Sequence, residues 1–161
     1  MNKLKFFALS SLIIFQFACT TYAPSNIMLG KTKAELIGLL GEPNRICKDG
    51  LLTRLDFQRG PAGMHTFFVY LDDSERIVSW RQVLTEENFA LIKVDMTKDK
   101  VIELIGQTDM IKQLARNRGY VWSYRFETVD CKYFAIEFTS EDKVRSAGYI
   151  QRGGKYCRII N

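Results

Sequence analysis

The sequence contains one histidine, His65, and three prolines among its 161 residues. Because histidine is the commonest metal ligand and general base, a single copy leaves little room for either chemistry. Three prolines and 11 glycines exclude collagen-like and proline-rich chains. Hydrophobic residues make up 47% and charged residues 25% of the chain, which is typical of a globular protein with one domain or two very small ones.

The sequence also lacks an apolar run long enough to span a bilayer. Residues 6–18 form an uncharged, mainly apolar run of 13 residues, whereas a spanning helix needs about 20. Because Lys3 and Lys5 precede this run, we predict that residues 1–18 are a secretory signal peptide. Without them the chain keeps 21 basic and 18 acidic residues, a net charge of +3 that is too weak and scattered to predict nucleic-acid binding.

Cys19 follows this apolar run directly, with the small Ala18 before it. This arrangement resembles the bacterial lipoprotein lipobox, in which the cysteine is lipidated and becomes the first residue. The resemblance implies a lipid anchor on Cys19 and a linker over residues 19–26. Since Thr20 is not an acidic retention signal, it also implies the periplasmic face of the outer membrane. The alternatives are ordinary secretion and an uncleaved anchor.

Three further cysteines, Cys47, Cys131 and Cys157, show no C-x-x-C or zinc-like spacing, so we predict no metal and no cofactor. An exported protein enters an oxidising compartment, where a disulfide can form. Cys131 and Cys157 lie in the same half of the chain and are the favoured pair. The alternative is three buried free thiols that pack as small hydrophobic residues.

Two segments of the chain repeat one another. Residues 27–41 align with residues 92–106, with identical isoleucine, threonine, lysine, leucine and glycine positions. After a slip of two residues, residues 55–77 align with residues 122–144 in hydrophobic character. We therefore predict a first repeat over residues 27–84 and a second over residues 85–161.

The same secondary structure is expected in each repeat. Thr32 and Thr97 have the spacing of helix N-caps, and Gly41 and Gly106 end the two helices. A further short helix is expected over residues 85–92. Alternating apolar residues predict strands over residues 53–59, 66–71 and 77–84, and again over 122–127, 134–138 and 144–150. The predicted fold class is α+β: two units, each with one or two helices packed on a three-stranded antiparallel meander.

The second repeat reads I-x-x-D-M-T-x-x-x-V-x-x-L-I-G over residues 92–106, followed by V-W-x-Y-R-F over residues 121–126. This pattern resembles the SmpA/OmlA (BamE-like) family of outer-membrane lipoproteins, in a tandem form. The chain departs from the family motif at Asp95, where the family has glycine, and at Thr108, where it has proline. A tandem of one fold also resembles, more weakly, the fold of the secreted β-lactamase inhibitor protein.

No catalytic motif stands out, so we expect a protein that is not an enzyme. On the first predicted sheet, one apolar face should pack against the helix of the same repeat. The opposite face should carry four further hydrophobic residues, Phe68, Tyr70, Val78 and Trp80. An exposed patch with aromatic residues is typical of a partner-binding surface. The alternatives are an interface with the second repeat, and a lipid-facing surface.

Together these features predict a non-enzymatic outer-membrane lipoprotein. The family resemblance implies an accessory role in outer-membrane protein assembly or envelope integrity, with a periplasmic or outer-membrane protein complex as partner. The alternative is a periplasmic protein-binding or enzyme-inhibitor module.

Overall fold

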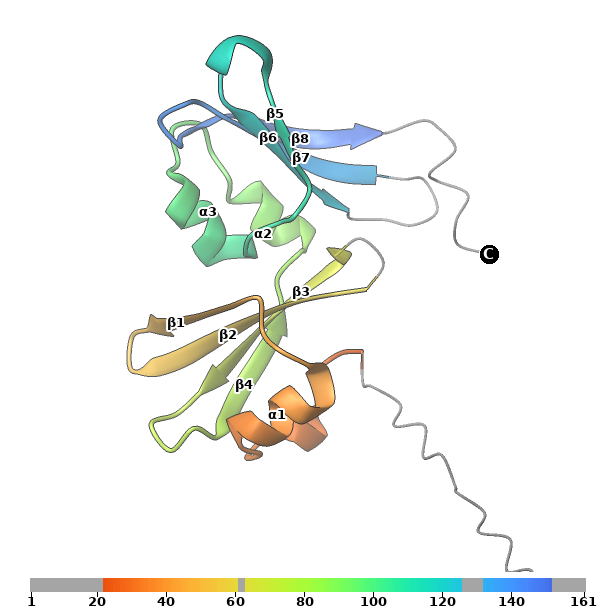
Figure 1. The fold of residues 1–161 in the computed structure, drawn as a ribbon, viewed down its shortest axis with the longest axis vertical. Helices are drawn as coiled ribbons and strands as arrows, with labels where there is room; N and C mark the ends of the chain where they lie inside the picture. The colour runs from red at the N-terminus through yellow and green to blue at the C-terminus, as the bar shows by residue number, and fades with distance from the viewer. Residues whose placement is uncertain (1–21, 61–62, 126–131, 152–161) are drawn as a thin grey trace, which may run out of the picture.

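The computed structural model describes residues 22–60, 63–125 and 132–151, which form two four-stranded antiparallel sheets (Figure 1). The strand orders are β1-β2-β3-β4 and β5-β6-β7-β8, so each strand pairs with its neighbour in sequence. The strands are β1 Arg45–Asp49, β2 Leu52–Arg59, β3 His65–Leu71, β4 Ile77–Gln82, β5 Ile111–Gln113, β6 Tyr120–Arg125, β7 Lys132–Phe138 and β8 Val144–Gln151. The helices are η1 Asn26–Met28, α1 Lys33–Leu40, α2 Glu86–Ala90, α3 Lys98–Ile105 and η3 Ala115–Asn117.

Helix α1 begins at a complete capping box. The Thr32 side chain accepts from the backbone N–H of Glu35, and the Glu35 carboxylate accepts from the backbone N–H of Thr32. The helix buries Leu36 and Leu40 against one face of the first sheet, where Leu55, Phe57 and Val69 are also buried. Each such side chain stabilises the fold by about 1.5–3 kcal/mol.

Helices α2 and α3 cover one face of the second sheet. Thr97 caps α3 by accepting from the backbone N–H of Lys100, and Thr85 caps α2. The Phe89 ring of α2 stacks on Phe134 of β7, with 4.3 Å between the ring centroids. This core is richer in aromatic residues than that of the first unit, because Trp122, Tyr124 and Phe138 belong to it.

The two units repeat one another in backbone detail. Gly41 and Gly106 end α1 and α3 with φ of +78° and +76°, in the region that glycine adopts without steric cost. Thr32 and Thr97, the two N-caps, each form an isolated bridge to the hairpin of their own unit. A β-bulge interrupts the last strand pair of each sheet, at Val78 in β4 and at Arg145 in β8.

The predicted fold class is wrong. The chain has a β-rich fold of two four-stranded sheets, and not an α+β tandem of helices on three-stranded meanders. The additional strands are β1 and β5, whose residues are nearly all exposed. They escaped prediction because an exposed edge strand has no buried face, so its sequence shows no alternation of apolar and polar residues. Their pairing comes from backbone hydrogen bonds to β2 and β6.

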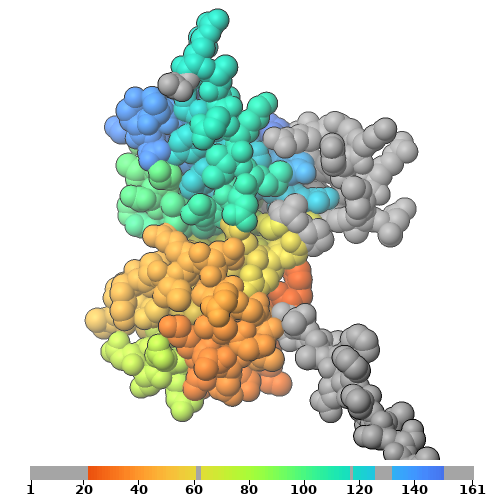
Figure 2. All heavy atoms as spheres, in the orientation of Figure 1, coloured from red at the N-terminus to blue at the C-terminus, as the bar shows by residue number. Residues whose placement is uncertain are grey.

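The units stack so that the helices of the second lie between the two sheets (Figure 1). Helix α1 covers the outer face of the first sheet, and α3 lies against its inner face. Figure 2 shows the orange and yellow part of the first unit in broad contact with the green part of the second. The first sheet is therefore covered on both faces.

Candidate functional site

Strand β4 lies at one edge of the first sheet and carries two of the four residues predicted to bind a partner. Leu71 of β3 pairs with Ile77, whereas the preceding Tyr70 pairs with Ser79, so Val78 is the extra residue of a β-bulge. From residue 79 onward the bulge reverses the alternation of the strand. Trp80 consequently pairs with Val69, which belongs to the core beneath α1.

The four predicted residues therefore do not share one face, and this part of the prediction is wrong. Phe68 and Tyr70 face the second unit, and the guanidinium of Arg81 lies 5.6 Å and 6.0 Å from their ring centroids. Trp80 instead packs on the core beneath α1, 6.1 Å from the Phe67 ring. Val78 is 44% exposed at the bulge. At the edge of the sheet the predicted patch keeps only Val78 and the half-buried Trp80, both on β4, and we call these two residues the β4 edge.

Phe68 is fully buried at the junction between the units. A Cβ atom added to Gly106, at the end of α3, would lie 3.3 Å from the Phe68 ring and 2.9 Å from the Thr66 methyl group. Glycine therefore lets α3 approach the sheet closely. At this point the apolar inner face of the first sheet is an interface between the two units. This is the alternative in which the face packs on the second repeat and does not bind a partner.

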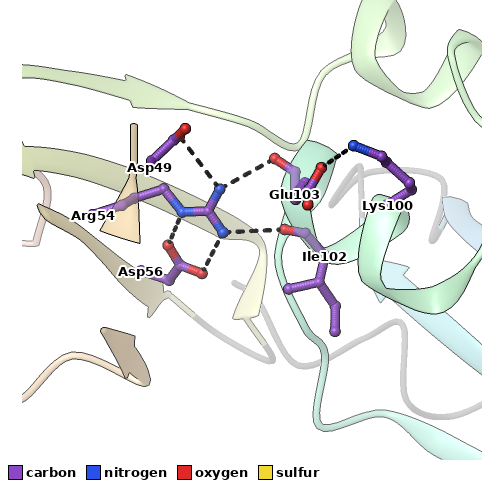
Figure 3. A network of polar contacts seen from close by, with 6 residues as sticks. All are labelled: Asp49, Arg54, Asp56, Lys100, Ile102 and Glu103. Carbon is purple, nitrogen blue, oxygen red and sulfur yellow. Dashed lines mark hydrogen bonds and ion pairs between the residues drawn. The ribbon is translucent and has the colours of Figure 1, made fainter. Parts of the chain in front are cut away.

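A buried arginine joins the units beside Phe68. The Arg54 guanidinium forms two hydrogen bonds to the Asp56 carboxylate, of 2.8 and 3.2 Å, and lies 3.9 Å above the Phe68 ring. Its two terminal nitrogens also donate to the backbone carbonyls of Ile102 and Glu103 at 3.4 Å (Figure 3). These contacts connect β2 of the first sheet to α3 of the second unit.

The position of Arg54 follows from the chemistry of helix ends. The last carbonyls of a helix have no partner within the helix and carry a partial negative charge. Arg54 supplies both a cation and donors to the last turn of α3, and Gln58 donates to the Gln107 carbonyl just beyond it. At the end of α1 the carbonyls of Leu40 and Glu42 accept instead from Arg59 of the same unit.

The electrostatics of this pair are set by burial. The side chains of Arg54 and Asp56 are 3% and 5% exposed. Burial raises the pKa of the Asp56 carboxyl, and the hydrogen bonds and charge of Arg54 offset part of that effect. Sequence reasoning missed both residues because an R-x-D pair on a strand resembles an ordinary solvated face until the second unit covers it.

Two small cavities of about 110 and 160 Å³ lie at the junction, and Asp56 lines the smaller one. Both are lined by Gln58 and Thr66 of the first sheet and by Asp109 of the second unit. They are smaller than the usual 300–1,000 Å³ of small-molecule sites. The junction thus holds the two units together around a buried ion pair and leaves little room for a ligand.

The signal peptide over residues 1–18, the lipidation candidate Cys19 and the disulfide candidates Cys131 and Cys157 lie outside the described residues. Cys47 on β1 is a free, half-buried thiol. His65 begins β3, where its ring accepts or donates a hydrogen bond with the Tyr22 hydroxyl. Burial lowers the pKa of His65.

Within residues 22–60, 63–125 and 132–151, no group of three His, Cys, Asp or Glu side chains has the arrangement of a metal site. In the same ranges no helix combines the length and apolar character needed to cross a bilayer.

No protein-family model matches the sequence, and no characterised protein matches it. Among solved structures the chain resembles an extracellular SCP-domain protein of Bacillus anthracis, at 10% identity and a TM-score of 0.33 over 94% of this chain and 50% of that one. It also resembles a DUF4309 family protein of Bacillus subtilis, at 10% identity and a TM-score of 0.31 over 80% of this chain and 84% of that one. The chain spans about half the length of the first of these proteins. Likenesses at this level carry no argument about function.

Proposed function

We propose that the protein is a non-enzymatic lipoprotein of the outer membrane, facing the periplasm, that acts as a BamE-like accessory in outer-membrane protein assembly or envelope integrity. The observation that carries the proposal is the apolar segment of residues 6–18, which ends directly at Cys19. A thiol at that position is the acceptor that lipoprotein anchoring requires.

The contacts of Tyr22 support an anchor close to the first unit. Tyr22 follows Cys19 by only three residues, and its hydroxyl is hydrogen-bonded to His65 at the start of β3. Since an extended chain spans at most about 3.6 Å per residue, Tyr22 lies within roughly 11 Å of Cys19, so lipid on Cys19 would hold the start of the first unit near the membrane surface. Ile27 of η1, which is 80% exposed, belongs to that membrane-proximal part.

The β4 edge is the surface we assign to the partner. At Ile77 the backbone of this edge is already bonded to Gly30 and Lys31, but from Val78 onward no further strand pairs with it within the described residues. Its side chains are the exposed Val78 and the half-buried Trp80. The part of the edge beyond Ile77 can accept a further strand or dock an apolar segment, because an edge strand presents backbone groups that no neighbouring strand pairs.

Site-specific photocrosslinking in intact envelopes tests this function. A photoreactive phenylalanine analogue at Val78 should crosslink the lipidated protein to a component of the barrel-assembly machinery. The matched control is Val94, an exposed valine of the second unit, which should give no such adduct. A soluble periplasmic enzyme crosslinked at Val78 would support the inhibitor alternative, and equal adducts at both positions would refute a specific β4 edge.

A further inference from the structure

The connection between β5 and β6 is longer than its counterpart in the first unit. There, only Gly50 and Leu51 connect β1 to β2, whereas residues 114–119 connect β5 to β6. Figure 1 shows this longer connection at the end of the second unit that lies away from the first unit. Since the shorter connection satisfies the same pair of strands, the fold does not require the longer one, and binding residues are often found on such loops.

This connection carries two arginines, Arg116 and Arg118. The φ of +61° and ψ of +36° at Arg116 lie in the left-handed region, which glycine and asparagine adopt more readily than other residues. The turn by itself therefore does not favour an arginine at this position. Both arginines are exposed, and neither guanidinium has a hydrogen bond or an ion pair among the residues that the structure describes.

Arg145 of β8 holds the connection over the outer face of the second sheet. Its guanidinium donates to the Arg118 backbone carbonyl at 2.7 Å and to the Glu137 carboxylate. Glu137 lies between Ile136 and Phe138 on β7, which both belong to the core. Because neighbouring residues of a strand point to opposite faces, the Glu137 side chain points away from α2 and α3. The connection is thus fixed on the face of this sheet that is turned away from the helices.

A depression of about 500 Å³ lies beside this connection, and its volume is within the range of small-molecule sites. Its lining consists of three arginines, one glutamate and two small apolar contributions, namely Arg116, Arg118, Arg145, Glu137, Leu114 and Ala115. Since Arg145 is paired with Glu137, the depression keeps a net charge of +2 from the two unpaired arginines.

We propose that this depression binds a small soluble molecule with a phosphate monoester, whose oxygens accept hydrogen bonds from the Arg116 and Arg118 guanidinium groups. A phosphate monoester carries a charge of about −1.5 to −2 at pH 7, which matches the charge of the two arginines. Its three outer oxygens can accept from two guanidinium groups at once, whereas a single carboxylate is matched by one. Leu114 and Ala115 provide apolar contact for the organic part of the molecule.

The position of the depression favours a soluble ligand over a lipid headgroup. It lies on the second unit, on the side away from the first unit, whereas the N-terminal segment enters the first unit (Figure 1). A membrane that holds the chain by its N-terminal segment would therefore lie on the other side of the molecule. The site itself depends neither on an anchor at Cys19 nor on the β4 edge.

Isothermal titration calorimetry of the full-length protein with glycerol 3-phosphate tests the proposal. Binding should be saturable, and glycerol, which lacks the phosphate, should show none. Arg116→Gln and Arg118→Gln should each weaken binding roughly tenfold, the loss expected for a charge-assisted hydrogen bond. Because both side chains are exposed, the urea midpoint of either variant should equal that of the parent. The matched control is Lys93→Gln, which removes an exposed positive charge of the same unit outside the depression and should leave the affinity unchanged.

Two competitors identify the chemistry and the source of the ligand. Succinate, a dicarboxylate, should bind more weakly than glycerol 3-phosphate, and equal affinity would overturn the assignment to a phosphate. Phosphatidylcholine vesicles that contain phosphatidic acid present the same monoester on a lipid and should not compete, so competition would overturn the assignment to a soluble ligand. The absence of saturable binding, or an equal loss of affinity in Lys93→Gln and Arg116→Gln, would overturn the site itself.

Discussion

Replacing Arg54 with alanine should destabilise the protein far more than the loss of an arginine from an exposed ion pair. The side chain is 3% exposed, and its loss leaves the Asp56 carboxylate, 5% exposed, without its two hydrogen bonds. Removing one partner of a buried ion pair costs about 3–5 kcal/mol. That loss is a large share of the roughly 5–15 kcal/mol by which such proteins are stable.

Urea denaturation at pH 7 measures this effect as a shift of the unfolding midpoint. The matched control is Arg145→Ala, which removes an arginine paired with Glu137 at the surface, with side chains 42% and 32% exposed. An exposed pair contributes at most about 1 kcal/mol. The double variant Arg54→Met, Asp56→Leu should recover most of the loss, because apolar residues can replace a buried pair at little cost.

The deficit of Arg54→Ala should depend on pH in one direction. Burial already raises the pKa of Asp56, and the variant removes the hydrogen bonds and charge that offset this effect. The folded state then binds a proton at pH values where the unfolded chain, with a pKa of about 3.9, has lost it. Stability of the variant therefore falls as the pH rises through this window and recovers as the pH approaches 4. A deficit below about 1 kcal/mol at pH 7, or one equal at pH 4 and pH 7, would refute the argument.

Gly106→Ala should destabilise the protein by more than Gly41→Ala, although both glycines have nearly the same φ. Of these two positions, only the Cβ at Gly106 would approach a neighbour within 3.0 Å. Equal shifts in thermal midpoint would contradict the close approach of α3 to the first sheet. Cys19→Ser should abolish labelling by an acyl probe and release the protein from the membrane fraction, and a labelled Cys19→Ser protein would disprove the anchor. The lowered pKa of Asp142 contributes stability that is present above the ordinary aspartate pKa and is lost as the pH falls through the lowered value. Asp142→Asn should therefore lower the urea midpoint at neutral pH, and the difference from the parent should vanish in acid. A difference unchanged at pH 3 would contradict the pairing with Lys98.

Local features of the fold were predictable because their causes are local. The capping box at Thr32 and the glycines that end α1 and α3 act over a few residues, and the structure has both helices within one residue of the caps. The predicted strands that alternate apolar and polar residues, such as β6 and β7, form as expected because each has one face against a core.

The edges and the bulge could not be predicted in the same way. Strands β1 and β5 have no buried face, so nothing in their residues distinguishes them from loops. The bulge at Val78 depends on pairing with β3, and it moved Trp80 from the predicted patch to the core beneath α1. A single extra residue in a strand reverses every side chain after it, and the sequence of β4 shows no sign of this.

The helix caps, the repeat and the residues that fill each core follow from the amino-acid sequence alone, because they depend on neighbours along the chain or on a periodic pattern. What covers the inner face of the first sheet depends instead on how the two units pack. Phe68 could have faced solvent, a partner or the second unit with the same local pattern. The contact between its ring and the end of α3 joins residues almost 40 positions apart. Such a contact forms through the complementary shapes and charges of two folded surfaces, which neither segment carries alone.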